Sequence, residues 1–559
     1  MSWILGGFSK KGDFNKIRIP FSPGIKHEKR NQVIYGAGQS LISFTSTNNF
    51  FHIISGSGLS EDLKLLDMHD WEHIVNSDED LSNLNGHFVV INEVQDGFQI
   101  INDQLGLREL FFYDNGIEVF FSTRLDWIVN LIEFPTINPN FLSSLWSFEN
   151  PLIYETLFDD VILLGPGGKA RISKNGIEIS NNPWRLKKKK SCITNVVDSI
   201  SKIIDSIISK NGKVNLGFSG GLDSRSLVSL LLNYDKKFWE SHTFGQKSNF
   251  DVKIANSIAN SFKFNHFHHD IKPFSADDIF GTWKDFVLET NCLLPANSYH
   301  ELNYYNVLPK GEFFIDGGKG EYLRRGLSNR LAILGKQALL DKNINEINKY
   351  LQLPKPDIFS KDVVTAWNDI QDKQIINLIT TMPEVNELGI HNWVDLYNIR
   401  YRSSNSSYPS QTRLDNLTLN LMPFIQPKVL NEVLNLPSSF RSKELINREM
   451  LNRFARLKLF PLARYNTIVP FQYNKYTSLI WGKMMRIFLK ESSKNTKNFL
   501  ELNKESLLSR FSESNFINST FYNKKLIKDT INGYYKGQNN NTSFLLWWMT
   551  FDQWHQLLH

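Results

Sequence analysis

A strand–turn–helix pattern at residues 214–232 constrains the fold of this chain more than any other feature. A β-rich stretch at 214–218 leads into the turn Ser219-Gly220-Gly221, which is followed by Asp223-Ser224. Apolar residues then recur with helical spacing over 227–231. A strand, a tight loop and a helix in this order indicate an α/β domain with a parallel sheet.

The turn predicts an anion-binding site. Gly220 and Gly221 carry no Cβ, so the backbone can approach a ligand closely. The loop N–H groups, the hydroxyls of Ser219 and Ser224 and the positive end of the helix dipole converge where a phosphate or pyrophosphate would sit. Asp223 brings a carboxylate to the same place. A carboxylate beside a phosphate is favourable only if a cation lies between them, and Mg²⁺ is the usual cation.

The hexapeptide 219–224 resembles the PP-loop of ATP pyrophosphatases, which cleave ATP between the α- and β-phosphates. The chain has no Gly-x-x-x-x-Gly-Lys-[Ser/Thr] sequence, so this loop is not built for γ-phosphoryl transfer. The resemblance implies ATP and Mg²⁺ as cofactors. The residues expected to contact them here are Gly217, Ser219, Gly220, Gly221, Asp223 and Ser224. A glycine-containing β–α turn without a ligand is the alternative interpretation.

The pattern of elements changes along the chain. Short apolar or alternating runs between 86 and 122, separated by turn pairs such as Asp96-Gly97, predict an antiparallel meander. Beyond the lysine run at 187–190, strand-like and helical patterns alternate, as in a parallel sheet. We therefore expect one domain over 1–185 and a second over 191–559, with the lysine run as a solvated linker.

Two segments of the second part are predicted in more detail. A strand is expected at 238–244 and a helix at 251–261. The histidines at 266, 268 and 269, with Asp270, raise the alternative of a metal site. Because nothing else completes a ligand set, histidines on the surface of a strand are the favoured interpretation.

Composition and charge exclude several function classes. The net charge of +6 is spread over the chain, which gives no basis for nucleic-acid binding. The two cysteines, Cys192 and Cys292, are far apart and lack metal spacing, which fits a reducing cytoplasmic location. No run reaches the length of a membrane span, and residues 1–7 do not resemble a signal peptide. The aromatic segment at 544–558 is predicted to be a packed helix rather than a membrane anchor.

The first part of the chain resembles the asparagine synthetase family, which includes β-lactam synthetases and lasso-peptide cyclases. Residues 84–89 and 102–112 are similar to the family pattern L-x-G-x-F … D-x-L-G-x-x-P-L-Y, and 121–124 and 164–168 to its next two landmarks. The resemblance implies an N-terminal glutaminase-like fold of the N-terminal-nucleophile type, a four-layer αββα sandwich. It also implies that a PP-loop α/β domain of the adenine nucleotide α-hydrolase kind follows, with helical additions.

The second part resembles the same family. Thr243-Phe244-Gly245 is similar to the strand that binds the adenine side of ATP, and 421–437 to a later helical region. The run from Asp316 to Glu321 falls where the family has S-G-E-G-x-D, with Glu321 in the place of the second magnesium-binding carboxylate. The resemblance therefore adds Phe244, Gly245, Asp316 and Gly317 to the nucleotide contacts. It implies Asp223 and Glu321 as magnesium ligands and Asp223, Glu321 and Tyr322 as catalytic residues.

Departures from the family pattern predict that the glutaminase is inactive. A working glutaminase of this family has Cys at position 2, where this chain has Ser2. A hydroxyl is a much poorer nucleophile than a thiolate. Ser55 stands in the place of the asparagine of the glutamine pocket, and Asp70 is a remnant of the glutamine-binding acid.

The motifs of the second part also depart from the family pattern. Gly318 occupies the family's acid/base position, and Ile468 aligns with its late lysine. The residues that could substitute are Tyr322, Glu312, Arg464 and Lys475, because geometry and not spacing decides such roles.

These observations predict an ATP-dependent, AMP-forming ligase that joins a carboxylate to an amine, in an amide, lactam or isopeptide bond, without using glutamine. The resemblance suggests a peptide, an amino sugar or a small acid as substrate, and leaves open a homo-oligomer or a partner protein. Another PP-loop activity, such as RNA thiolation, is a weaker alternative, because this chain has no cysteine pair to handle sulfur and no strongly basic face to bind RNA. A non-enzymatic alternative is a nucleotide-binding scaffold or interaction protein that has the same fold but is catalytically impaired.

Overall fold

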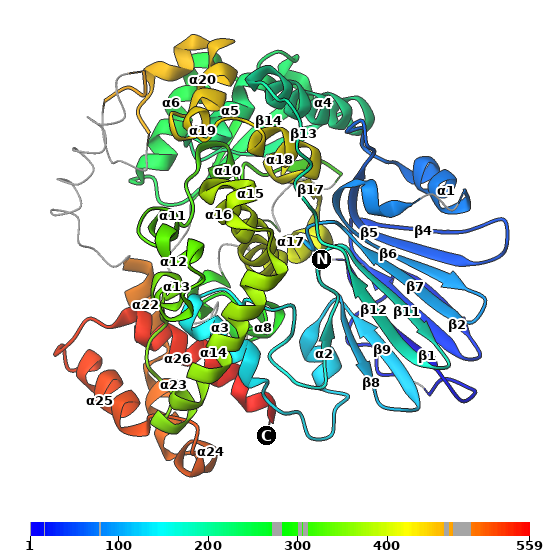
Figure 1. Cartoon of the computed structure of the whole chain (residues 1–559), viewed down its shortest axis with the longest axis vertical. Coiled ribbons are helices and arrows are strands. Elements are labelled where there is room, and N and C mark those ends of the chain that lie inside the picture. The colour runs from blue at the N-terminus through cyan, green and yellow to red at the C-terminus, as the bar shows by residue number, and fades with distance from the viewer. Residues whose placement is uncertain are drawn as a thin grey trace.

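The computed structural model describes residues 2–15, 17–77, 80–270, 282–299, 305, 311–462, 469–472 and 494–558. Over these ranges the chain is a mixed α/β protein with two antiparallel sheets, one parallel sheet and many helices (Figure 1). Ile468, Arg464 and Lys475 lie outside the described residues.

Both antiparallel sheets come from the first part of the chain. In spatial order, the first sheet consists of β10 (Ile162–Leu163), β8 (Phe111–Asp114), β9 (Glu118–Ser122), β1 (Trp3–Ser9), β3 (Gln32–Ala37) and β2 (Ile25–Lys29). The second consists of β12 (Gly176–Asn181), β11 (Gly168–Ser173), β7 (Gly97–Asn102), β6 (Asn85–Val94), β5 (Phe51–Leu59) and β4 (Leu41–Thr45). Val94 pairs with Gly97 across the turn that Asp96-Gly97 predicts, so the expected antiparallel meander is confirmed there.

The two sheets pack face to face and are covered by helices on their outer faces. The space between them is filled from both sides by Ile4, Phe8, Ile34, Ile53, Val89 and Ile91. Helix α1 (Met68–Asn76) packs Trp71 against the outer face of the second sheet. Helix α2 (Leu125–Val129) covers the outer face of the first sheet, and helix α3 (Pro139–Phe148) belongs to the same apolar cluster. The layers therefore follow in the order helix, sheet, sheet, helix, which is the order that the family resemblance implies.

The third sheet is parallel throughout. Its strands, in spatial order, are β15 (His266–His269), β14 (Trp239–Phe244), β13 (Val214–Gly217), β16 (Phe313–Ile315) and β17 (Leu419–Leu421). The chain runs outward from β13 to β15 and then returns to the opposite side of β13 with β16. The strand order therefore reverses between β13 and β16, and the carboxyl ends of these two strands form the topological switch point where open α/β sheets bind ligands.

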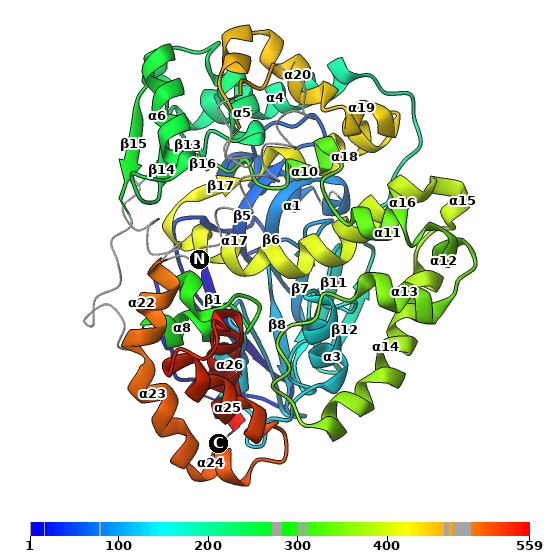
Figure 2. The ribbon, with the colours of Figure 1, turned by 90° about the vertical axis from the view of Figure 1, so that its left-hand side faces the viewer.

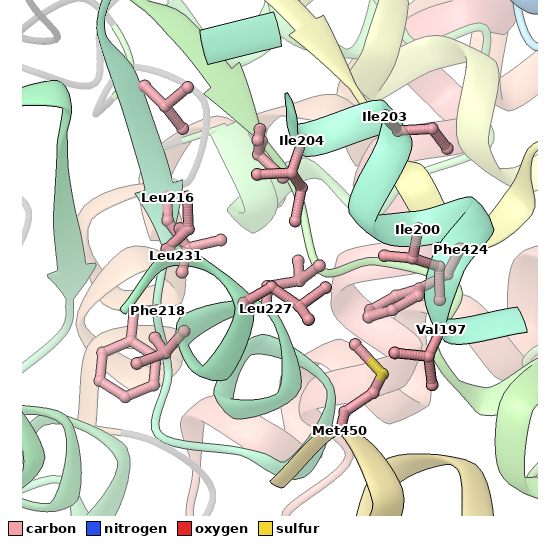
Figure 3. Close-up of a cluster of buried hydrophobic side chains, with 14 of the residues drawn as sticks. Val197, Ile200, Ile203, Ile204, Leu216, Phe218, Leu227, Leu231, Phe424 and Met450 are labelled. Carbon is pink, nitrogen blue, oxygen red and sulfur yellow. The ribbon is translucent and has the colours of Figure 1, made fainter. Parts of the chain in front are cut away.

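Helices α4 (Ile193–Asn211), α5 (Leu222–Leu231) and α6 (Phe250–Phe262) accompany the parallel sheet. Figure 3 shows part of the core that they form, in which side chains of α4, α5 and β13 face one another. Strand β14 and helix α6 confirm the elements predicted at 238–244 and 251–261, and the three histidines lie on strand β15 as favoured.

Helices make up the remainder of the described chain. They are α8 (Thr282–Glu289), α10 (Glu321–Arg324), α11 (Asn329–Ile333), α12 (Lys336–Leu340), α13 (Ile344–Leu351), α14 (Lys361–Thr381), α15 (Val385–Leu388), α16 (Ile390–Tyr397), α17 (Ser404–Leu417), α18 (Pro427–Leu434), α19 (Ser438–Ser442), α20 (Leu445–Asn452), α22 (Lys494–Leu502), α23 (Lys504–Ser509), α24 (Ser514–Asn518), α25 (Lys524–Tyr535) and α26 (Thr542–His555). A π-helical segment, η5 (Asn398–Ser403), joins α16 to α17. Helices α22 to α26 lie together at the end of the molecule away from the parallel sheet (Figure 2). Helix α26 is largely buried, as predicted for a packed helix, and among the described helices none is long and apolar enough to cross a membrane.

The lysine run at 187–190 lies between strand β12 and helix α4. In the described ranges, no sheet continues through it. Nevertheless the two sides are joined by a buried ion pair, in which the Arg108 guanidinium donates to both carboxylate oxygens of Asp415, with Nη2 to Oδ1 at 2.8 Å. Their side chains are 1% and 0% exposed.

We expect Arg108→Met to lower the free energy of unfolding by about 3–5 kcal/mol, because it leaves the buried Asp415 carboxylate without its counterion. Urea unfolding of the two proteins measures the difference. As a control, Lys342→Met breaks the exposed pair with Glu384, whose side chains are 52% and 58% exposed, and should cost less than about 1 kcal/mol. Equal losses in the two variants would contradict the prediction.

Candidate functional site

The loop at 218–221, called the cradle loop here, joins β13 to α5 as predicted. Gly220 has φ +69°, and a Cβ there would lie 2.8 Å from Cγ2 of Ile254, so glycine is required. Gly221 N–H donates to Ser219 Oγ at 3.3 Å, and the hydroxyl oxygens of Ser219 and Ser224 are 3.4 Å apart. The two hydroxyls thus lie side by side at the N-terminal end of α5, where the helix dipole favours an anion.

Arg225 fixes the back of the cradle loop. Its fully buried guanidinium donates to the carbonyl oxygens of Gly220 at 2.6 Å, Phe460 at 2.9 Å and Pro461 at 2.6 Å. This role could not be predicted from the sequence, because Phe460 and Pro461 lie more than 200 positions from Arg225.

The loop at 316–320, called the glycine loop here, follows β16 and touches the cradle loop. A Cβ at Gly317 would lie 3.2 Å from the backbone N of Ser224. A Cβ at Gly320 would overlap Cγ of Asp223 and lie 2.7 Å from its Oδ1. Since β13 and β16 are adjacent parallel strands, their carboxyl ends bring together two segments that are about a hundred residues apart in the sequence.

Charged groups of both signs surround this contact. The Asp223 carboxylate accepts two hydrogen bonds from Arg324, from Nε at 3.1 Å and from Nη2 at 2.7 Å. Burial lowers the pKa of Lys319, against the opposing effect of the Glu321 carboxylate. Burial also raises the pKa of Asp316, whose Oδ1 accepts the Gly318 N–H at 2.8 Å. The cradle loop and the glycine loop, with the helices that follow them, thus supply carboxylates and cations to one small region.

Tyr322 follows Glu321 on helix α10 and is almost completely buried. Its hydroxyl lies 2.6 Å from Ser403 Oγ in the π-helical segment η5. Burial raises the pKa of the Tyr322 phenol well above its ordinary value, so the neutral form is strongly favoured. A catalytic role for Tyr322 stays a prediction.

The residues predicted on the adenine side lie at the carboxyl end of β14, beside the cradle loop. Gly245 has φ +134°, and its N–H donates to the His269 carbonyl oxygen at 3.1 Å. Thr243 Oγ1 donates to the Phe218 carbonyl oxygen, which ties the end of β14 to the cradle loop. Phe244 and Gly245 therefore line the neighbouring strand end, next to Ser219. Glu312, in contrast, precedes β16 and lies at the opposite end of that strand, paired with Lys213.

The donor set allows a test of the predicted Mg²⁺. Among the described residues, no three His, Cys, Asp or Glu side chains are grouped as a metal site. Asp223 and Glu321 provide two carboxylates, which is the usual protein contribution when phosphate oxygens and water complete the coordination of Mg²⁺. These residues fit a cation that arrives with a nucleotide. Arg324 occupies the Asp223 carboxylate in the structure and would have to release it.

Of the residues predicted from the glutaminase resemblance, Ser2 and Ser55 both lie near Ser40, whereas Asp70 lies apart. Ser2 is buried and its Oγ lies 2.7 Å from Ser40 Oγ. Ser55 lies within strand β5. Asp70 is on the other side of the second sheet, where it completes the capping box of α1 with Asp67 and pairs with Lys210. The contacts of Asp70 are those of a helix cap.

Comparisons with known proteins add little. No protein-family model matches the chain, and none of the curated proteins matches its sequence. Among solved structures, glutamine phosphoribosylpyrophosphate amidotransferase from B. subtilis, complexed with ADP and GMP, is 12% identical with a TM-score of 0.18, and the match covers 53% of this chain and 63% of that chain. The allosteric regulatory enzyme of purine biosynthesis is 10% identical with a TM-score of 0.20, over 60% of this chain and 72% of that one. The chain thus spans less than two thirds of the first of these, and such low scores define no fold family for it.

We expect Gly320→Ala to destabilise the protein by about 1–3 kcal/mol, because the new methyl group overlaps Asp223. Gly320 has right-handed helical φ and ψ of −61° and −15°, so alanine itself adds no backbone strain. Thermal or urea unfolding measures the loss. In the matched control Gly24→Ala, the nearest atom to the new methyl is 4.0 Å away, and stability should change little.

The purified protein should release no glutamate from glutamine. Ser2 offers a hydroxyl in place of a thiol, and that hydroxyl is buried against Ser40. A coupled glutamate assay of the wild type and of Ser2→Ala should give the same background rate. Glutamate release that Ser2→Ala abolishes would overturn this expectation.

Proposed function

We propose that this chain is an ATP-dependent ligase that activates a carboxylate by adenylation and then joins it to an amine. The proposal rests mainly on the contact between the cradle loop and the glycine loop at the switch point of the parallel sheet. Each loop is followed by a helix whose first turn carries a carboxylate, Asp223 on α5 and Glu321 on α10. A glycine-rich loop at a helix N-terminus favours a bound phosphate, and paired carboxylates favour its metal ion.

In the proposed reaction, a carboxylate oxygen of the substrate attacks the α-phosphorus of ATP. The bond from the α-phosphorus to the bridging oxygen of the β-phosphate breaks, and pyrophosphate leaves. The N–H groups of the cradle loop and the hydroxyls of Ser219 and Ser224 hold the pyrophosphate oxygens, with the dipole of α5 behind them. Mg²⁺, held by Asp223 and Glu321, would supply positive charge to the leaving group. An amine then attacks the acyl carbon and displaces AMP.

Positively charged side chains of the protein could also stabilise the leaving pyrophosphate. Arg324 and Lys319 both lie within the electrostatic range of Glu321, and Arg402 adds to the positive field at Lys319. Once Arg324 has released Asp223, these positive groups can stabilise charge as it develops on the departing phosphates. We assign the adenine side of the nucleotide to Phe244 and Gly245, and contacts near the α-phosphate to Asp316 and Gly317.

The amine donor in this proposal is not glutamine-derived ammonia. Ser2 replaces the thiol nucleophile, and Asp70 is used as a helix cap. Residues 1–185 then form a scaffold domain, and 191–559 the synthetase domain. The acid and amine substrates are proposed to include a peptide or an amino sugar, as the family resemblance suggests.

A nucleotide-binding scaffold without turnover is the second candidate. Two observations favour it: Gly318 has no side chain to transfer a proton, and Arg324 already neutralises Asp223. In that case ATP would bind at the same place without being cleaved.

The ligase proposal predicts the products of ATP cleavage. With a panel of carboxylic acids and hydroxylamine as a general amine, the protein should form AMP and pyrophosphate, and Asp223→Asn should lower the rate at least about a hundredfold by removing the charge that anchors the cation. Chromatography of labelled nucleotides measures the products. Asp235→Asn is the control, since Asp235 is an exposed helix cap.

Formation of ADP and phosphate would contradict the proposal, because a cradle loop that holds the leaving pyrophosphate requires cleavage between the α- and β-phosphates. ATP binding that is abolished by mutations in the cradle loop, without cleavage under any condition of the panel, would instead establish the scaffold.

A further inference from the structure

A pocket of about 830 Å³ lies beside the segment that connects the antiparallel sheets to α4. Its walls come from residues 152–155, 183–188, the end of α14, and the run from α15 to η5. This volume is in the range of sites that enclose small organic ligands, roughly 300–1,000 Å³. The pocket shares no lining residue with the cradle loop or the glycine loop.

Most of the wall is apolar. It includes Leu152, Tyr154, Met382, Leu388, Leu396 and Tyr401. The rings of Tyr154 and Tyr401 stack with centroids 5.4 Å apart and planes 4° from parallel. A rigid stacked pair of this kind presents a flat surface, which suits a planar apolar group of a ligand.

One buried cation in the wall lacks an anionic partner. Arg400 is 7% exposed, and its Nε has no hydrogen-bond partner among the described residues. Its other nitrogens make long contacts with uncharged acceptors: Nη1 with the Thr381 carbonyl oxygen at 3.5 Å and the Met382 sulfur at 3.7 Å, and Nη2 with the Trp184 carbonyl oxygen at 3.3 Å. Burial lowers the pKa of Arg400. Because an unpaired buried charge is strongly unfavourable, the guanidinium is expected to meet an anion.

The remaining charges of the pocket limit that anion to a single negative charge. The charged lining residues are Arg185, Lys188, Arg400, Glu155 and Glu387. Three cations and two carboxylates leave one net positive charge. A carboxylate carries one charge and is planar, so it can pair with a guanidinium side by side.

We infer that this pocket binds a small organic acid, with its carboxylate on Arg400 and a planar apolar group against Tyr154 and Tyr401. The site is separate from the proposed nucleotide site, so the inference does not depend on the proposed ligase activity.

The test uses 4-fluorobenzoate as the probe, titrated against the full-length protein and followed by ¹⁹F NMR. We expect saturable binding, and at least about tenfold weaker binding of the neutral isostere 4-fluorobenzamide. 4-Fluorophenyl phosphate, which carries up to two negative charges, should also bind more weakly than the acid. Equal affinities for acid and amide, tighter binding of the phosphate ester, or no binding of the acid up to about 10 mM would overturn the inference.

Two variants locate the binding. Arg400→Gln should weaken 4-fluorobenzoate at least about tenfold, while Arg171→Gln, the same change at an exposed position of strand β11, should leave it unchanged. Leu388→Trp places a larger side chain in the wall of the pocket without removing a charge and should also block binding. If Arg400→Gln does not fold, as judged by its melting curve, Leu388→Trp decides the question. Unchanged binding in Leu388→Trp would overturn the inference.

Discussion

The candidate site depends on the absence of side-chain atoms where two loops meet. Gly317 and Gly320 allow the glycine loop to pack directly on Ser224 and Asp223. This approach is possible because β13 and β16 are neighbouring strands that run in the same direction, so their carboxyl ends leave the sheet together. The core behind them, formed by α4, α5 and β13, holds the strand ends in place (Figure 3). The position of Asp223 against the glycine loop is therefore a consequence of strand order.

Three buried arginines show different ways in which this fold accommodates a desolvated charge. Arg225 is surrounded by carbonyl oxygens and thereby shapes the cradle loop. Arg108 is paired with Asp415 and joins the antiparallel part to helix α17. Arg400 has two carbonyl oxygens and the Met382 sulfur at 3.3–3.7 Å and no anionic partner among the described residues. A buried positive charge is unfavourable unless hydrogen-bond acceptors or an anion surround it. The acceptors of Arg225 and Arg108 belong to distant segments, so these two arginines hold those segments together. Arg400 has no anion beside it, and this indicates where a ligand would supply one.

The local parts of the fold could be predicted from the sequence, and the long-range parts could not. Glycine placement and apolar spacing were enough for the strand, loop and helix around Ser219-Gly220-Gly221, because those elements are set by neighbouring residues. The partners of Arg225 and Arg108 could not be found in this way, since no local pattern records a contact across more than 200 positions. The cap of α1 was also within reach of the sequence, because the spacing of Asp70 from Asp67 is that of a capping box.

The six residues of the π-helical segment η5 contact both the pocket and the neighbourhood of the candidate nucleotide site. Arg400 and Tyr401 line the pocket, whereas Ser403 contacts Tyr322, the neighbour of Glu321. A π-helical turn contains one residue more than an α-helical turn, and the wider turn absorbs that residue. Loss of one residue from η5 would close the turn to α-helical spacing and shift Arg400 and Tyr401 relative to Ser403. Such a deletion would therefore disturb the pocket and the contact with Tyr322 together, although α16 and α17 could keep their facings.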